Sequence, residues 1–241
     1  DFKFKKGLVS ATKTSGHTLQ IADGLWLDKK FKAAMMKSIA QSELDRKRFV
    51  YSDIGFILLQ QVVEAVTGKT LDAYLVSEFY RPMGLEHTLF QPLNRYKKAD
   101  IMPTAANDYL RRQDLCGYVH DEAAAFMGGV SGNAGLFSTA QELGKIYQMI
   151  LNEGELDGKR YLRPETCRIF TTEKSAVSHR GLGYDKPNLK DPKANACASS
   201  APASVYGHTG FTGTCAWVDP ENDLVYIFLS NRLCPDAWNG K

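Results

Sequence analysis

The feature that most constrains the fold is a pair of apolar runs near the C-terminal end of the sequence. The first run covers 215–218, the second covers 224–229, and both contain β-branched and aromatic residues. The stretch between them, 219–223, reads Asp-Pro-Glu-Asn-Asp, which is typical of a turn. Two such runs around a turn predict an antiparallel β-hairpin.

The stretch ahead of this hairpin, 208–214, reads His-Thr-Gly-Phe-Thr-Gly-Thr. Gly210 and Gly213 therefore lie in or beside the first strand, where glycine weakens a sheet unless another backbone or a ligand must approach closely. A His-Thr-Gly sequence on such a strand predicts an edge that binds something. The sequence leaves open the alternative that His208 is a loop residue that only precedes the hairpin.

Composition is that of an ordinary globular protein. The 241 residues are 44% hydrophobic and 24% charged, which allows one large domain or two small ones. No apolar run approaches the roughly 20 residues that span a bilayer. A net charge of +3 is too small to predict nucleic-acid binding. We therefore expect no nucleic-acid partner.

The five cysteines do not predict a metal site, a cofactor or a disulfide scaffold. They stand at 116, 167, 197, 215 and 234, widely spaced and without a Cys-x-x-Cys pair. Cys215 falls within the first apolar run and is expected to be buried. No metal and no cofactor are predicted.

Helical periodicity is clearest in the first two thirds of the chain. Helices are predicted over 29–41, over 54–67 with Ser52 or Asp53 as N-cap and Gly68 as the stop, and over 70–80. A capping box at 139–142, Thr-Ala-Gln-Glu, starts another helix that ends near 152–154. We expect a turn at 13–18 and loops over 91–125 and 184–203.

Several short motifs occur in an order that resembles one family. They are Tyr51-Ser52-Asp53 at a helix start, Pro-Met-Gly-Leu at 82–85, the glycine-rich passage 128–137, and His-Thr-Gly at 208–210. Together they resemble the serine β-lactamase and penicillin-binding protein family, most closely its class C β-lactamase and esterase-like branch. The resemblance covers 51–233. It implies an α/β fold in which an antiparallel sheet packs with helices beside an all-helical lobe.

The resemblance implies acyl-enzyme chemistry with two catalytic residues in this chain. A serine attacks a β-lactam, ester or peptide carbonyl, and a lysine and a tyrosine manage the proton. Tyr51 takes the place of that tyrosine, as a base or proton relay. His208 takes the place of the usual lysine of the third motif. Without the family context, Tyr51 would more simply be a packing residue and Ser52 a helix cap.

The same resemblance implies a set of substrate contacts. Thr209 and Gly210 would contact the substrate, and the backbone N–H of Phe211 would supply half of the oxyanion hole. Asp53 stands where an asparagine normally binds the substrate's amide. Because a carboxylate accepts but does not donate unless it is protonated, Asp53 puts the substrate preference in question.

Two further features have a structural and a functional interpretation. His120-Asp121 is either an oriented histidine in the site or part of a structural hydrogen bond. The glycines of 128–135 either line the site or serve tight turns only.

The family's nucleophile is not evident in the sequence. The only Ser-x-x-Lys upstream of Tyr51 is Ser10-Ala11-Thr12-Lys13, and the Thr-Ser-Gly-His-Thr that follows at 14–18 cannot continue a helix. We therefore expect the nucleophile to lie outside the sequence, in a single β-lactamase-like domain cut at both ends. The helical lobe would cover roughly 1–180 and the remaining strands roughly 204–233.

The sequence therefore predicts part of a serine hydrolase acting on β-lactam, D-Ala peptide or ester substrates, and inactive by itself. The alternative is a non-catalytic wall-binding or regulatory module with the same fold. The expected partner is a small-molecule or peptidoglycan-type substrate. We expect self-association through exposed sheet edges. The resemblance also allows fusion to another wall-active catalytic domain. It implies a periplasmic or cell-envelope location.

Overall fold

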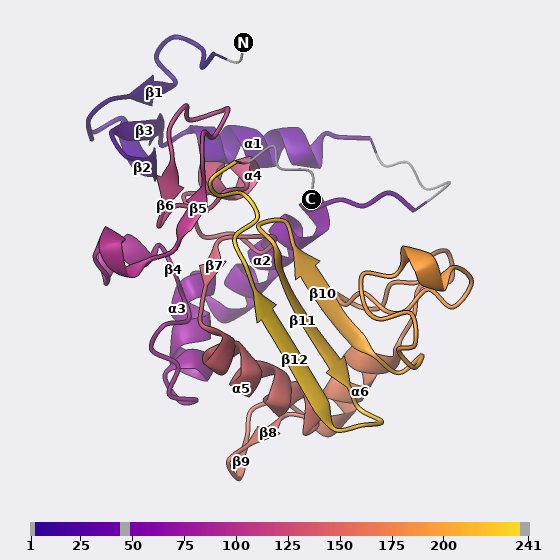
Figure 1. The fold of residues 1–241 in the computed structure, drawn as a ribbon. Helices are drawn as coiled ribbons and strands as arrows, with labels where there is room; N and C mark the ends of the chain where they lie inside the picture. The colour runs from indigo at the N-terminus through magenta and orange to yellow at the C-terminus, as the bar shows by residue number, and fades with distance from the viewer. Residues whose placement is uncertain (1–2, 44–48, 237–241) are drawn as a thin grey trace.

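The structure, a computed structural model, describes residues 3–43 and 49–236 (Figure 1). A three-stranded sheet and helices that pack beside it form one half of the molecule, and a set of short strands and helices forms the other (Figure 1). Within the described residues, no helix is both long and apolar enough to cross a bilayer.

The predicted hairpin is confirmed and belongs to a three-stranded antiparallel sheet. β11 (Thr214–Asp219) pairs with β12 (Leu224–Leu229), and β10 (Tyr206–Gly210) adds to the other edge of β11. α5 (Ala140–Leu151) packs against β12. Along β12, Val225 and Ile227 are half-buried, whereas Leu224, Tyr226 and Phe228 are exposed. The outer strand therefore presents an open apolar face.

The helices predicted before residue 81 are confirmed. They are α1 (Phe31–Ala40), α2 (Ile54–Thr67) and α3 (Leu71–Leu75), which continues as a π-helical turn, η1 (Val76–Tyr80). Gly68 ends α2 in a left-handed conformation, with φ 67°. Ser52 Oγ accepts a hydrogen bond from the Ile54 N–H, whereas the Asp53 side chain makes no capping bond. Asp53 is therefore the N-cap residue by position, but its carboxylate does not cap α2 and is available for other contacts.

The capping box at α5 is only half formed. Thr139 Oγ1 accepts from the Glu142 N–H at 3.3 Å, as predicted. The Glu142 carboxylate does not return to the cap but accepts hydrogen bonds from the Glu86 and His87 N–H groups and from Thr88 Oγ1. The helix thereby holds the distant segment 86–88 in place.

An N-terminal β-sheet was not predicted. β2 (His17–Ala22) and β3 (Leu25–Asp28) form a hairpin around Asp23-Gly24, and β1 (Val9–Ser10) pairs with β3. His17 and Thr18, expected in a turn, begin β2. The buried Ile21 and Leu27 of this hairpin pack on Val119, Ala124 and Ala125 and so form one of the hydrophobic clusters.

Residues 91–125, expected to be loop with short turns, are mostly irregular and contain only strands, turns and a helix of two to five residues each. The small elements of the chain are β4 (Leu89–Phe90), η2 (Pro92–Asn94), η3 (Lys98–Asp100), β5 (Pro103–Ala105), β6 (Leu115–Cys116), α4 (Glu122–Phe126), β7 (Leu136–Phe137), β8 (Glu155–Leu156), β9 (Lys159–Arg160), α6 (Pro164–Thr172) and η4 (Pro192–Ala194). The region predicted as a helical lobe, 1–180, thus also carries β1 to β9. Cys215, predicted to be buried, is half-buried in β11, where its cross-strand neighbours Thr209 and Phe228 are both exposed.

Candidate active site

Arg180 joins the two residues predicted to be catalytic. Tyr51 precedes α2, and His208 lies in β10, paired with Ala216. Arg180 Nη1 lies 2.8 Å from His208 Nε2, and the Arg180 guanidinium carbon lies 4.9 Å from the centroid of the Tyr51 ring. A cation–π contact and a hydrogen bond therefore connect Tyr51 and His208 through one guanidinium group.

Arg180 is held in this position by the segment that follows it. The Asp185 side chain is buried, and its carboxylate lies 2.8 Å from His179 Nε2 and 3.5 Å from Arg180 Nη2. The backbones of Asp185 and Gly207 exchange two hydrogen bonds, of 2.7 and 3.1 Å, beside β10. The loop that carries Arg180 is thus attached to the strand that carries His208.

These contacts define the proton position on His208. Arg180 is a donor only, so Nε2 of the His208 ring must accept. Nδ1 lies 2.6 Å from the Thr209 carbonyl oxygen and must therefore carry the proton. Both nitrogens of the His208 ring are thus engaged within the protein.

Tyr51 and Asp53 lie close to several acidic groups. Burial raises the pKa of Tyr51, and the charges of Asp53, Asp121 and Asp185 raise it further, against a lowering effect of Arg180. Burial also raises the pKa of Asp53, as does Asp121, whereas His208 and a hydrogen bond with Tyr51 lower it. Tyr51 is therefore a protonated phenol at neutral pH, not a phenolate.

The glycine-rich passage forms a wall of this site. Asn133 Nδ2 donates to Asp121 Oδ1 at 3.0 Å, and Asp121 also caps α4 through the Ala124 N–H. A Cβ on Gly132 would overlap the Phe56 carbonyl oxygen of α2. Gly132 thus permits close packing on α2. The side chain that the passage contributes is Asn133, which holds Asp121, whose charge raises the pKa of Tyr51 and of Asp53.

Phe211 and His120 pack against each other beside β10. Their ring centroids lie 4.9 Å apart, with 20° between the ring planes. Arg232 covers the Phe211 ring at 4.5 Å and donates from Nε to the Phe211 carbonyl at 2.7 Å. Burial lowers the pKa of His120, which favours its neutral form. The role of the Phe211 N–H in an oxyanion hole stays a prediction.

The remaining predicted contacts are Thr209 and Gly210, both in β10. Because side chains alternate along a strand, Thr209 projects from the opposite face of β10 to His208. A Cβ on Gly210 would overlap Thr214 Oγ1, so the glycine meets a neighbouring side chain there. The structure therefore brings Tyr51, Asp53 and His208 together, but not the Thr209 side chain.

Ser10 lies away from any helix. It is part of β1, where it pairs with Trp26, and its Oγ accepts from the Thr12 N–H. Lys13 Nζ lies 5.6 Å from the centroid of the Trp26 ring. Ser10 and Lys13 are thus not arranged on one helical face.

Arg180 and Asp185 were missed at the level of the sequence. An arginine in an irregular segment carries no local pattern, and its role here depends on contacts with residues more than 20 positions away. In the part of the chain that the structure describes, no group of three His, Cys, Asp or Glu side chains could hold a metal ion.

Comparisons with known proteins agree on one family. The family model described as Beta-lactamase matches residues 11–237. A "Putative D-alanyl-D-alanine carboxypeptidase" of Escherichia coli (strain K12) is 38% identical over 197 residues, which cover 77% of this chain and 45% of the relative. An "N-acetylmuramyl-L-alanine amidase" of Bacillus subtilis (strain 168) is 36% identical over 197 residues, 77% of this chain and 44% of the relative.

A solved structure has the same fold. A penicillin-binding protein homolog from Caulobacter crescentus matches with a TM-score of 0.58 at 18% identity, over 92% of this chain and 62% of that one. The chain spans about half the length of the curated relatives it matches.

Proposed function

The chain belongs to the Beta-lactamase family, and from this premise we propose that it forms the substrate-recognising part of a serine hydrolase that acts on D-alanyl peptides through an acyl-enzyme. The observation that carries the proposal is the connection of Tyr51 to His208 through Arg180. Relatives named for D-alanyl-D-alanine and N-acetylmuramyl-L-alanine substrates support a peptidoglycan-type substrate over a free β-lactam or an ester.

In this proposal, the nucleophile is a serine outside residues 1–241. Ser10 lies in a strand, and the curated relatives are about twice as long as the part that this chain matches.

Tyr51 acts in the proposed reaction as a proton donor. Its raised pKa keeps the phenol protonated, so it is suited to protonating the leaving group when the acyl-enzyme forms. The proton of the attacking serine would pass to the lysine of the family's Ser-x-x-Lys motif, which in this proposal lies with the serine outside residues 1–241. A base role would require a further cation near the phenol, because the effect of Arg180 alone does not outweigh burial and the surrounding acids.

Asp53 and Arg180 would select the substrate. Asp53 accepts an amide N–H, which a peptide offers and an ester does not. Arg180 presents donors to a carboxylate, such as the C-terminal group of a D-alanyl peptide. Both preferences favour peptide substrates.

The test is covalent labelling of the full-length protein with a fluorophosphonate and with a penicillin, read by intact mass and peptide mapping. We expect one labelled serine outside residues 1–241. We also expect Tyr51→Phe and Arg180→Met to slow labelling by about 10²-fold, the scale of a lost acid–base group. Ser10→Ala serves as the control and should leave labelling unchanged. A label on Ser10 would overturn the proposal.

A binding module without catalysis is the second candidate. It is favoured by the position of Ser10 in β1, away from any helix. The same experiment separates the two candidates, because a full-length protein that binds D-alanyl peptides but acquires no label is a binding module.

Location and assembly are further proposals that rest on the family. We propose that the protein works in the periplasm or cell envelope, where its substrate occurs, and that it is joined to another wall-active catalytic domain. Fractionation of source cells with an antibody against this chain tests both, through the compartment and the size of the detected protein.

A further inference from the structure

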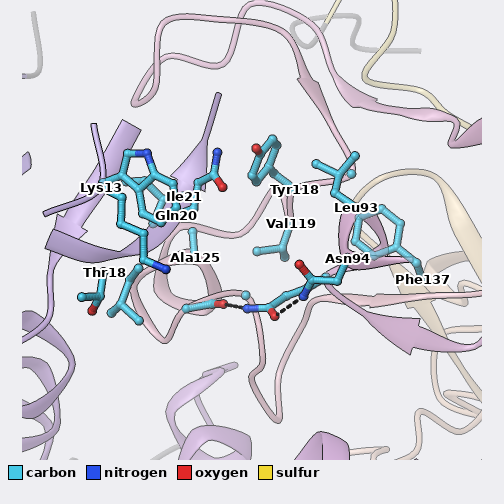
Figure 2. Close-up of a pocket in the computed structure, with 16 residues that line it drawn as sticks. Lys13, Thr18, Gln20, Ile21, Leu93, Asn94, Tyr118, Val119, Ala125 and Phe137 are labelled. Carbon is cyan, nitrogen blue, oxygen red and sulfur yellow. Dashed lines mark hydrogen bonds between the residues drawn. The ribbon is translucent and has the colours of Figure 1, made fainter. Parts of the chain in front are cut away.

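A cavity of about 320 Å³ lies away from the candidate active site, between the N-terminal hairpin and the loops after β4 and β6. Figure 2 shows Lys13, Thr18 and Gln20 on one side, Leu93, Asn94 and Phe137 on the other, and Tyr118 and Val119 between them. This volume is at the small end of the roughly 300–1,000 Å³ of ligand pockets, so it suits one or two rings of a ligand.

The walls of the cavity are apolar and aromatic. The buried side chains of Ile21, Val119 and Ala125 contribute to its lining. Trp26 is half-buried, and Tyr118 is fixed by a hydrogen bond from its hydroxyl to Asp23 Oδ1 at 3.0 Å. Two aromatic rings therefore lie in the wall with limited freedom to move.

The rim of the cavity is made of exposed amide, hydroxyl and ammonium groups. Asn94 Nδ2 donates to Gln91 Oε1 at 3.0 Å, and Gln91 Nε2 donates to the Gly128 carbonyl, so these amides are oriented before a ligand arrives. The cavity is lined by one cation, Lys13, and none of the described residues that line it is acidic. Such a rim suits a neutral or anionic ligand rich in hydrogen-bonding groups.

This combination matches a sugar. Aromatic rings pack on the C–H face of a pyranose, and amide side chains bind hydroxyl and acetamido groups. The lysine and the lack of lining carboxylates disfavour a free amino sugar, which is a cation. We propose that the cavity binds an N-acetylated amino sugar, the glycan part of a peptidoglycan-type substrate, an identity that rests on the proposed function.

Two segments connect this cavity with the candidate active site. Tyr118 and Val119 line the cavity, and the next two residues, His120 and Asp121, lie at the site. The glycine-rich passage likewise contributes Gly128 and Gly129 to the cavity before Asn133 reaches Asp121. A sugar in the cavity could therefore direct its attached peptide toward Tyr51.

The test is calorimetric titration of the 241-residue chain with triacetylchitotriose and with its deacetylated form. We expect the acetylated trisaccharide to bind with a Kd in the millimolar range or below, and the deacetylated one about tenfold more weakly. Equal binding of the two trisaccharides, or no binding of the acetylated one, would overturn the inference.

Two variants place the binding in the cavity. Trp26→Leu removes an aromatic wall and Asn94→Ala removes a rim amide, and each should weaken binding of triacetylchitotriose about tenfold. Tyr226→Leu, which removes an exposed aromatic ring on β12, is the matched control and should leave binding unchanged. Asn94 is exposed, so its variant keeps the test valid if Trp26→Leu misfolds. Full binding by folded Asn94→Ala would contradict the proposed location.

The titration is independent of the acyl-transfer chemistry. Sugar binding without labelling of any serine would leave this inference intact and contradict the proposed hydrolase. Labelling of a serine without sugar binding would leave the proposed hydrolase intact and contradict this inference.

Discussion

Arg180 donates to His208 across 2.8 Å, and the same guanidinium group covers the Tyr51 ring. Arg180, which lies in an irregular loop, thereby orients the His208 ring and places a positive charge beside the Tyr51 phenol. Asp53 raises the pKa of Tyr51 and Arg180 lowers it, so the two effects can be separated by substituting each residue in turn.

The first prediction concerns the pKa of Tyr51. Asp53→Asn removes a negative charge and should lower this pKa, whereas Arg180→Met removes a positive charge and should raise it. The measurement is an NMR titration of ring-labelled tyrosine, with the Tyr51 signal assigned through Tyr51→Phe. Arg180→Lys keeps the charge and should shift the pKa less than Arg180→Met. A shift in the same direction for Asp53→Asn and Arg180→Met would disprove the electrostatic account.

The second prediction concerns Glu142 and acid stability. Burial opposes ionisation of Glu142, but hydrogen bonds from Thr88, His87 and the Glu86 N–H outweigh it and lower its pKa to about 2. The pKa in the folded state is thus below that in the unfolded chain, so this contribution is fully present above about pH 4.5 and is lost as the pH falls toward 2.

Glu142→Gln should therefore lower the free energy of unfolding at neutral pH by about 1–3 kcal/mol, and the difference from the parent should shrink as the pH falls through that window. Urea denaturation between acid and neutral pH is the measurement. Glu165→Gln, at an exposed position in the first turn of α6, is the control and should change stability little. If Glu142→Gln lowered the free energy of unfolding by the same amount at every pH, the lowered pKa of Glu142 would not be the cause.

The third prediction compares two glycines. Gly132→Ala would drive a methyl group into the Phe56 carbonyl oxygen and should cost about 1–3 kcal/mol. Gly144 lies within α5, and a methyl group added there would meet nothing within 4 Å, so Gly144→Ala should stabilise by about 0.5–1 kcal/mol. Thermal unfolding of the two variants checks the opposite signs. Equal effects would show that packing on α2 does not determine the cost at Gly132.

The fourth prediction concerns a fully buried ion pair. The Asp108 and Arg111 side chains have no exposed surface, their charges meet at 2.8 Å, and Arg111 also donates to the His120 carbonyl. Arg111→Met leaves a buried carboxylate unpaired and should cost about 3–5 kcal/mol. Asp108→Leu combined with Arg111→Met should cost less than the sum of the two single changes. Additive costs in chemical denaturation would show that the pair does not act as a unit.

The fifth prediction concerns the open face of β12. Leu224, Tyr226 and Phe228 are each about half exposed on an edge strand, which is a template for association. We expect the weight-average mass in light scattering to rise with protein concentration, and Tyr226→Lys to reduce the rise. Val177→Lys, at an exposed loop position, is the control. A constant monomer mass at all concentrations would disprove association.

The sequence predicted the elements that are determined by apolar periodicity and by turn or cap residues close by in the chain. The hairpin of β11 and β12 follows from two apolar runs around a turn, and α2 follows from its apolar period and the stop at Gly68. The β2–β3 hairpin was overlooked although Asp23-Gly24 between alternating residues is a strong signal for such a turn. That element could have been predicted from the sequence.

Other features depend on long-range contacts and have no local pattern. Arg180 reaches Tyr51 and His208, which are 129 and 28 positions away. The capping box correctly placed the start of α5, but the Glu142 carboxylate found stronger partners in the distant segment 86–88. Tyr51, Asp53 and His208 could be selected from their motifs, whereas the residue that connects Tyr51 with His208 could not.

The bridge between Asp185 and Gly207 has a consequence for the evolution of the chain. Both ends of the intervening segment are hydrogen-bonded to each other, so insertions or deletions within 188–203 need not disturb Arg180 or His208. Doubling the length of such a closed loop costs only about 0.6 kcal/mol in closure entropy. The length of this loop can therefore vary between relatives while Arg180 and His208 keep their positions.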